Sequence, residues 1–103
     1  MTLEELKLSC KKAGFKYAYG VFKNPVEPPH LLAFSTDTNN FGADNKVFYK
    51  KTPIQLDYTY VDKNLEEQNK IENIILKDIY WNKSEETYLP DEKIWQVSYF
   101  FEI

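Results

Sequence analysis

Hydrophobic residues recur along the chain with two different periods, and these periods predict the elements of a small mixed fold. Near the N-terminus, Thr2 and Glu5 have the spacing of a helix capping box. The apolar residues after the cap return every three or four positions, as on one face of a helix: Leu3, Leu6, Cys10 and Ala13. Gly14 then favours a C-terminal stop. The first predicted element is a short amphipathic helix.

A second helix is predicted to begin after Asp62 or Asn64, either of which can cap it, and to run through Leu76. Its inner side is expected to hold mainly isoleucines, with a leucine and a glutamine: Leu65, Gln68, Ile71, Ile74 and Ile75.

Elsewhere the apolar period is two, which is typical of strands with one buried face. Strands are expected at 15–21, 31–35, 80–88 and 93–103, with a turn at 89–92. In the last strand the residues expected on one face are Trp95, Val97, Tyr99, Phe101 and Ile103. The prolines of the stretch 24–30 exclude a helix there, so this stretch is predicted to be an extended connector. A polar loop is expected at 36–45.

The segment 46–60 is also rich in strand-forming residues, but its apolar phase changes. Val47 and Tyr49 share one parity, whereas Ile54 and Tyr58 share the other. Because a shift of one residue moves every side chain to the opposite face, we expect a bulge or a break near 51–53, where Pro53 lies.

The predicted order is helix, two strands, a bent strand or strand pair, helix and two strands. Strands joined by short turns favour an antiparallel arrangement. We therefore predict an α+β fold, with a largely antiparallel sheet and two helices packed on one face. A length of 103 residues suits one domain, 1–103.

Composition and charge exclude some classes of function. With 43% hydrophobic and 17% aromatic residues, the chain is predicted to be globular and not disordered. A net charge of −3 and the absence of Arg argue against direct, sequence-specific nucleic-acid binding. No apolar run of membrane-spanning length is present, and the acidic N-terminus is unlike a signal peptide. We expect no membrane partner and a cytoplasmic location.

The residues that carry chemistry do not form an active site in the sequence. His30 is the single histidine, and no serine lies in a nucleophile elbow. Cys10 falls on the apolar stripe of the first helix, where a thiol is usually a buried hydrophobe. Asp37, Asn39 and Gly42 superficially fit a calcium loop, but Phe48 stands where its bidentate glutamate belongs. We predict no catalytic, cofactor-binding or metal-binding residues and no enzyme.

Aromatic residues give the positive signal. Phe48 adjoins Tyr49, Tyr80 adjoins Trp81, and Phe100 lies between two further rings. Neighbouring strand residues point to opposite faces, so both faces of several strands carry large rings. If helices cover one face, the rings on the other face are either covered by a partner or placed at strand edges with their hydroxyls in water. We favour a partner or oligomer interface.

Two segments carry a resemblance to a known family. They are Asn40-Phe41-Gly42-Ala43-Asp44-Asn45-Lys46-Val47-Phe48-Tyr49-Lys50-Lys51 and the ending from Glu86 to Ile103. The first follows the Pro-rich Glu27-Pro28-Pro29 and precedes Ile54-Gln55-Leu56. The chain resembles small morphogenesis proteins of phages and prophages of Gram-positive bacteria, similar to the tail completion, or tail terminator, proteins of long-tailed phages.

This resemblance implies a structural protein that forms a ring, with a hexamer as the expected form. The ring would cap the end of the tail tube and join it to the head. The implied partners are further copies of the chain, the major tail tube protein and a head–tail connector protein. The implied location is the host bacterial cytoplasm during assembly and then the virion. The residues expected at interfaces are Pro28, Pro29, Phe41, Asp44, Phe48 and Phe100.

Alternatives stay open at this stage. Phe41 is equally consistent with a loop anchor that packs into its own subunit. The protein is also compatible with a role as a head–tail adaptor or connector component. A further alternative is a small prophage-encoded binding module that acts as a monomer on a host protein.

Overall fold

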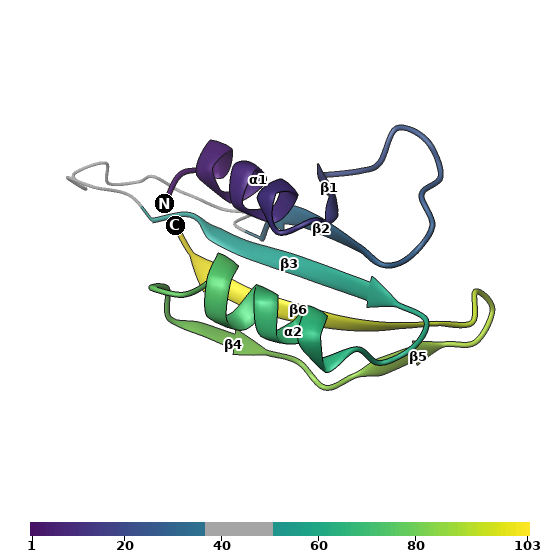
Figure 1. Cartoon of the computed structure of the whole chain (residues 1–103). Coiled ribbons are helices and arrows are strands. Elements are labelled where there is room, and N and C mark those ends of the chain that lie inside the picture. Colours follow the sequence, from purple (N-terminus) through teal and green to yellow (C-terminus); the bar gives the residue numbers. More distant parts are fainter. Residues whose placement is uncertain (37–50) are drawn as a thin grey trace.

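A computed structural model of the chain describes residues 1–36 and 51–103. Its helices are α1 (Leu3–Lys12) and α2 (Leu65–Lys70), and α2 continues into a π-helical turn, η1 (Ile71–Ile75). The strands are β1 (Lys16–Tyr19), β2 (His30–Ser35), β3 (Pro53–Tyr60), β4 (Trp81–Lys83), β5 (Thr87–Leu89) and β6 (Ile94–Glu102). Figure 1 shows one twisted sheet with the helices drawn in front of it.

The sheet has the order β1-β2-β3-β6-β4, and β5 also pairs with β6. The pairs β2–β3, β3–β6, β4–β6 and β5–β6 are antiparallel, so the prediction of an α+β fold with a largely antiparallel sheet is confirmed. The β1–β2 pair is parallel, which the sequence pattern did not indicate. The connector between these strands is long enough to return the chain to the start of β2, next to Lys16.

The first helix begins as the sequence predicts. The Thr2 hydroxyl accepts a hydrogen bond from the Glu5 N–H (3.1 Å), and the Glu5 carboxylate accepts one from the Thr2 N–H (2.8 Å). Leu6 and Cys10 are fully buried, whereas Leu3 is exposed. Leu3 was expected in the apolar stripe and lies outside the core, because the helix begins there at the margin of the sheet.

The second helix departs from the predicted α-helical period. Asn64 caps it through two hydrogen bonds to backbone N–H groups, as expected. From Ile71 the helix widens to a π turn, in which the Leu76 N–H donates to the Ile71 carbonyl (2.9 Å). Ile71, Ile75 and Leu76 are buried, whereas the predicted inner residues Leu65 and Ile74 are exposed. The wider turn moves Leu76 onto the buried side and turns Ile74 outward.

Two predicted strands have different bounds. Strand 15–21 shortens to β1, and Val21 is exposed beyond its end. The prediction of a single strand at 80–88 is wrong, because this stretch divides into β4 and β5. Lys83 pairs with Tyr99 and Thr87 with Gln96, so 84–86 lie opposite the shorter stretch 97–98. This is a bulge, and Ser84 bonds Ser98 across it through its backbone N–H (2.9 Å) and its hydroxyl (3.0 Å).

The core lies against one face of the central strands. Its buried side chains come from both helical segments and from β2, β3 and β6: Leu6, Cys10, Phe15, Leu31, Ala33, Ile54, Leu56, Tyr58, Tyr60, Ile71, Ile75, Leu76, Val97, Tyr99 and Phe101. The predicted inward face of the last strand is confirmed by Val97, Tyr99 and Phe101, with Trp95 and Ile103 packed beside them. β3 is regular from Pro53 onward, and Thr52 continues the pairing through two backbone hydrogen bonds with Ile103 (2.8 and 3.0 Å), so the bulge expected near 51–53 does not occur at 52–53. The residues before it, 46–50, lie outside the described residues.

Three buried tyrosines tie the surface to this core. The Tyr58 hydroxyl donates to Glu67 on α2 (2.5 Å), and the Tyr99 hydroxyl donates to Glu72 on η1 (2.7 Å). The Tyr60 hydroxyl donates to Glu86 in the bulge between β4 and β5. Burial, followed by the hydrogen bond to its glutamate, raises the pKa of each of these tyrosines far above the ordinary value. These contacts anchor α2, η1 and the bulge to the sheet.

Glu86 is expected to make stability sensitive to acid. The hydrogen bond from Tyr60, and then that from Lys63 (2.9 Å), lower the pKa of the Glu86 carboxyl. A carboxylate whose pKa is lower in the folded state stabilises above its unfolded pKa of about 4.3, and that contribution is lost as the pH falls. Glu86→Gln should therefore lose less stability than the wild type between pH 5 and pH 3, as measured by urea unfolding.

The neighbouring Glu85 provides the control for this acid effect, because its side chain is exposed and has no partner among the described residues. Glu85→Gln should keep the pH dependence of the wild type. An equal change in both variants would show that the contacts of Glu86 with Tyr60 and Lys63 are not the cause.

Candidate functional site

The strands direct a second set of side chains away from the core, and we call this surface the open face. It is formed by alternate residues of β2, β3 and β6: Leu32, Phe34, Gln55, Asp57, Thr59, Gln96, Ser98 and Phe100. No helix within residues 1–36 and 51–103 crosses it (Figure 1). The open face is the largest regular surface of the sheet that the described core leaves unused.

A polar network occupies the middle of the open face. The Ser98 hydroxyl donates to Asp57 Oδ1 (2.6 Å), and the Gln55 amide donates to the same oxygen (2.8 Å). The Gln55 amide also approaches the Ser98 hydroxyl (3.2 Å), and the Gln96 amide reaches Thr59 Oγ1 (3.5 Å). Asp57 and Thr59 are buried among these neighbours. The network holds the side chains of the two central strands in one fixed arrangement.

Apolar side chains flank this polar centre. Leu32 and Phe34 lie on β2, opposite Asp57 and Gln55 respectively, and both are partly exposed. On the far side, Phe100 of β6 is 40% exposed. A flat surface with a polar centre and apolar flanks suits contact with another protein surface, because it offers direct hydrogen bonds as well as area to bury.

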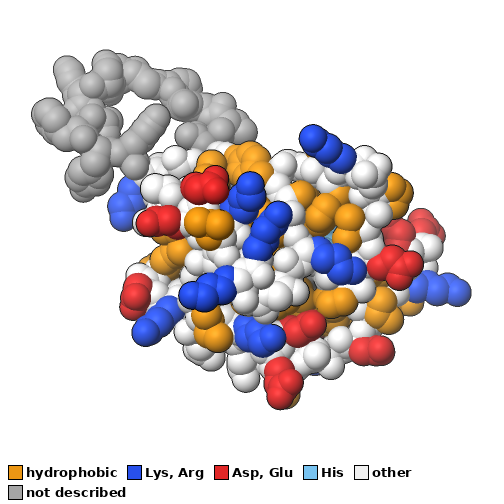
Figure 2. Space-filling view, turned by 45° about the horizontal axis from the view of Figure 1, so that its top comes forward, with side chains coloured by type: hydrophobic (Ala, Val, Ile, Leu, Met, Phe, Trp, Pro, Cys, Tyr) orange, Lys and Arg blue, Asp and Glu red, His pale blue; other side chains and the backbone are white. Residues whose placement is uncertain are grey.

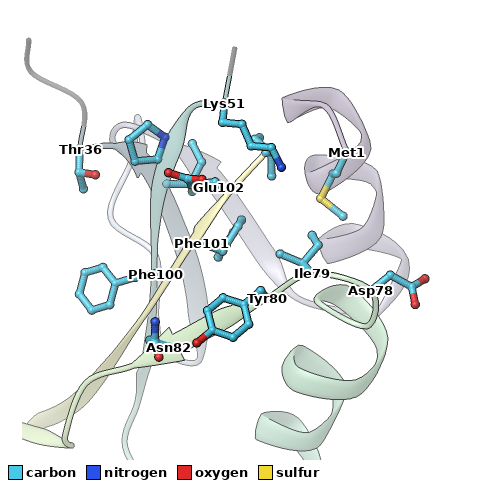
Figure 3. Close-up of a pocket in the computed structure, with 13 residues that line it drawn as sticks. Met1, Thr36, Lys51, Asp78, Ile79, Tyr80, Asn82, Phe100, Phe101 and Glu102 are labelled. Atoms are coloured by element: carbon cyan, nitrogen blue, oxygen red, sulfur yellow. The ribbon is translucent and has the colours of Figure 1, made fainter. Parts of the chain in front are cut away.

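The open face ends at a hollow of about 830 Å³, to which the ends of β3, β4 and β6 contribute. Figure 3 shows Phe100 and Tyr80 on either side of Asn82. Phe100 and Asn82 are cross-strand partners, and Tyr80 shares their side of the sheet because it precedes Asn82 by two residues. Tyr80 is 86% exposed. Two large rings therefore stand in water at this end of the open face.

The face shown in Figure 2 has a different character. The surface seen in Figure 2 carries lysine and acidic side chains spread among small hydrophobic groups, with no large continuous apolar area. Isolated apolar groups of that kind are normal on soluble proteins, whereas adjacent exposed rings indicate a binding surface.

The predicted interface residues that the structure describes do not come together in one place. Phe100 lies on the open face. Pro28 and Pro29 are half-buried in the connector before β2, at the opposite edge region of the sheet. Phe41, Asp44 and Phe48 lie outside the described residues, as do the polar loop centre and the segment compared with a calcium loop.

The residues weighed for chemistry occupy structural positions. His30 begins β2, and its ring packs edge-on against Phe22 with 4.9 Å between ring centres. Burial, and then the charge of Lys16, lower the pKa of His30. Cys10 is fully buried, and burial raises the pKa of its thiol to about 12. The thiol and the imidazole therefore favour their neutral forms.

Within residues 1–36 and 51–103, no group of three His, Cys, Asp or Glu side chains is placed to hold a metal ion. No helix of that part is long and apolar enough to cross a membrane.

The network around Asp57 is the feature of this site that the sequence reasoning missed. Tyr80 was part of the aromatic signal, as the neighbour of Trp81, but it was not named among the interface residues, and it lies just before the start of β4 at Trp81. The alternation of Gln55, Asp57 and Thr59 was a usable signal, because polar residues on the second face of a central strand mark a surface open to water or to a partner. Comparison of the chain with family models, with curated proteins and with solved structures finds no match.

Proposed function

We propose that this chain is a structural assembly protein of a long-tailed phage, a tail terminator that forms a ring at the end of the tail tube and joins it to the head. The observation that carries the proposal is the open face, which ends in the exposed rings of Phe100 and Tyr80. The resemblance of the sequence to tail completion proteins supports the phage tail as the partner that this surface binds.

The shape of the open face supports a macromolecular partner. The hollow beside Phe100 does not extend over the polar centre, where Asp57 and Ser98 bind each other. Small-molecule sites are concave and enclose most of their ligand. A broad sheet surface that is held rigid by its own hydrogen bonds instead matches the surface of another subunit or of the tube.

The edges of the sheet also suit a ring. β1 forms one edge, and β4 with β5 lines the other. These edges differ in sequence, in length and in the elements around them. Contacts between two unlike flanks are heterologous, and such contacts form a closed ring when each copy is rotated by a fixed fraction of a turn.

Phe100→Ser is expected to weaken attachment to the tail tube about tenfold or more, because the ring is exposed and its loss removes a large aromatic contact at one end of the open face. Ile74→Ser is the matched control: Ile74 is 62% exposed, but it lies on η1 away from the open face. Ile74→Ser should unfold within about 0.5 kcal/mol of the wild type, and circular dichroism should show Phe100→Ser folded. Equal attachment of both variants would exclude the Phe100 end of the open face as the contact.

Deletion of the gene from its phage tests the function itself. The expected phenotype is tails of abnormal length, or tails that do not join heads, in electron micrographs of the lysate. Expression of the wild-type chain from a plasmid should restore complete virions, and Phe100→Ser should restore them poorly. Normal virions in the absence of the chain would refute the terminator role.

A further inference from the structure

We infer that the hairpin between β5 and β6 of one copy binds a hollow beside β1 of the next copy, so that acidic and basic flanks alternate around the assembly. The inference rests on the proposed ring and names the surfaces that close it. The basic flank consists of Lys11, Lys12, Lys16 and Lys23; the acidic flank consists of Glu85, Glu86, Asp91 and Glu92.

Two lysines of the basic flank, Lys11 and Lys16, line a shallow hollow. This hollow, of about 490 Å³, lies between the end of α1 and the connector after β1 and is also lined by apolar and aromatic side chains. Phe15, Tyr17 and Val26 are among these side chains. From 11 to 23 the sequence contains no acidic residue, and all four lysines of the flank are exposed. The hollow therefore combines positive charge at its rim with apolar area.

The acidic flank is convex. It comprises the bulge before β5 and the β5–β6 turn, which projects from the end of the sheet in Figure 1. Tyr88 and Pro90 are exposed within it. Lys93, at the end of this turn, is the one basic residue from 84 to 93. The hairpin thus combines negative charge with exposed apolar groups, and it complements the hollow in charge and in apolar character.

Most of these charges are unpaired within the copy. Among residues 1–36 and 51–103, no ion pair is formed by Lys11, Lys12 and Lys23 on one flank or by Glu85, Asp91 and Glu92 on the other. Glu86 is the exception, since it binds Lys63. β1 and β5 lie at opposite edges of the sheet, so one copy cannot bring its two flanks together. A second copy can bring its acidic flank to the basic flank of the first. The attraction between opposite charges also fixes which flank of each copy meets which.

Charge reversal on each flank provides the test, with the mass of the full-length protein measured by sedimentation velocity. Reversal of the acidic flank (Glu85→Lys, Asp91→Lys, Glu92→Lys) leaves two positive flanks, and reversal of the basic flank (Lys11→Glu, Lys12→Glu, Lys23→Glu) leaves two negative ones. Each variant alone should stay monomeric under conditions in which the wild type associates. An equimolar mixture should associate again, because every contact then joins opposite charges.

The control is a reversal of three exposed lysines away from both flanks, Lys51→Glu, Lys70→Glu and Lys77→Glu, which changes the net charge as much as the basic-flank variant. This control should associate as the wild type does, and circular dichroism should show all variants folded. Association of the separate reversed variants, or no association of their mixture, would overturn the inference while leaving the ring intact. A wild-type chain that never associates would overturn both.

Discussion

Raising the pH above about 10 is expected to unfold this protein over a narrow range, with stability falling by about 4 kcal/mol per pH unit. Tyr58, Tyr60 and Tyr99 are buried and donate to glutamates, and their pKa values are raised in the folded state. A group with a raised folded pKa contributes stability that is complete below its unfolded pKa and is lost as the pH rises. Each tyrosine contributes about 1.4 kcal/mol per unit to this loss.

Chemical unfolding at pH 8, 10 and 11 measures this slope, and Tyr99→Phe tests its cause. The phenylalanine variant keeps the ring but has no proton to lose, so its slope should be smaller by about 1.4 kcal/mol per unit. The buried Cys10 thiol, whose pKa is raised to about 12, adds a loss of similar slope that begins near pH 9, and Tyr17, whose pKa burial also raises to about 12, adds to the loss above pH 10. A slope unaffected by Tyr99→Phe would contradict this explanation.

Leu6→Ala is expected to destabilise the protein by about 3–5 kcal/mol, close to the total stability of a small domain. Leu6 is fully buried in the core with side chains from the sheet and η1. Its removal leaves a cavity between α1 and the sheet, because the surrounding side chains relax only in part. Thermal and urea unfolding measure the loss.

Leu8→Ala is the matched control, since it removes the same atoms two residues further along α1. Leu8 is 57% exposed, so this variant should unfold within about 0.5 kcal/mol of the wild type. Similar losses in the two variants would mean that α1 does not pack as described.

Local chemistry explains why some elements could be predicted from the sequence. Thr2 and Glu5 define the start of α1 through contacts three residues apart, and Asn64 defines the start of α2 in the same way. Alternation in 93–103 shows which residues of β6 face the core. These signals depend on neighbours in the chain, so they persist whatever the tertiary arrangement.

Other features depend on contacts that the sequence pattern does not encode. Alternation in β1 and β2 is the same for parallel and antiparallel pairing, so the direction of β1 was not predictable. The π turn at η1 forms where Leu76 replaces Ile74 in the core, which depends on the shape of the sheet below it. The bulge at Ser84 likewise depends on the bonds of Ser98 on a neighbouring strand.

The candidate site was predictable only in part. Phe100 could be found because rings on both faces of one strand cannot all be buried by helices on one side. The polar network required knowledge that β3 and β6 are neighbours, since Asp57 and Ser98 are far apart in the sequence. The charged flanks are visible in the sequence, but their separation to opposite edges follows from the strand order.

Sedimentation velocity of the full-length chain, alone and mixed with the tail-tube protein of its phage, distinguishes a ring from a monomer. We expect a closed species whose mass is one fixed multiple of 12.2 kDa, which forms as concentration rises and is stabilised by the tube protein. A monomer of 12.2 kDa at every concentration, with the tube protein present, would contradict this expectation.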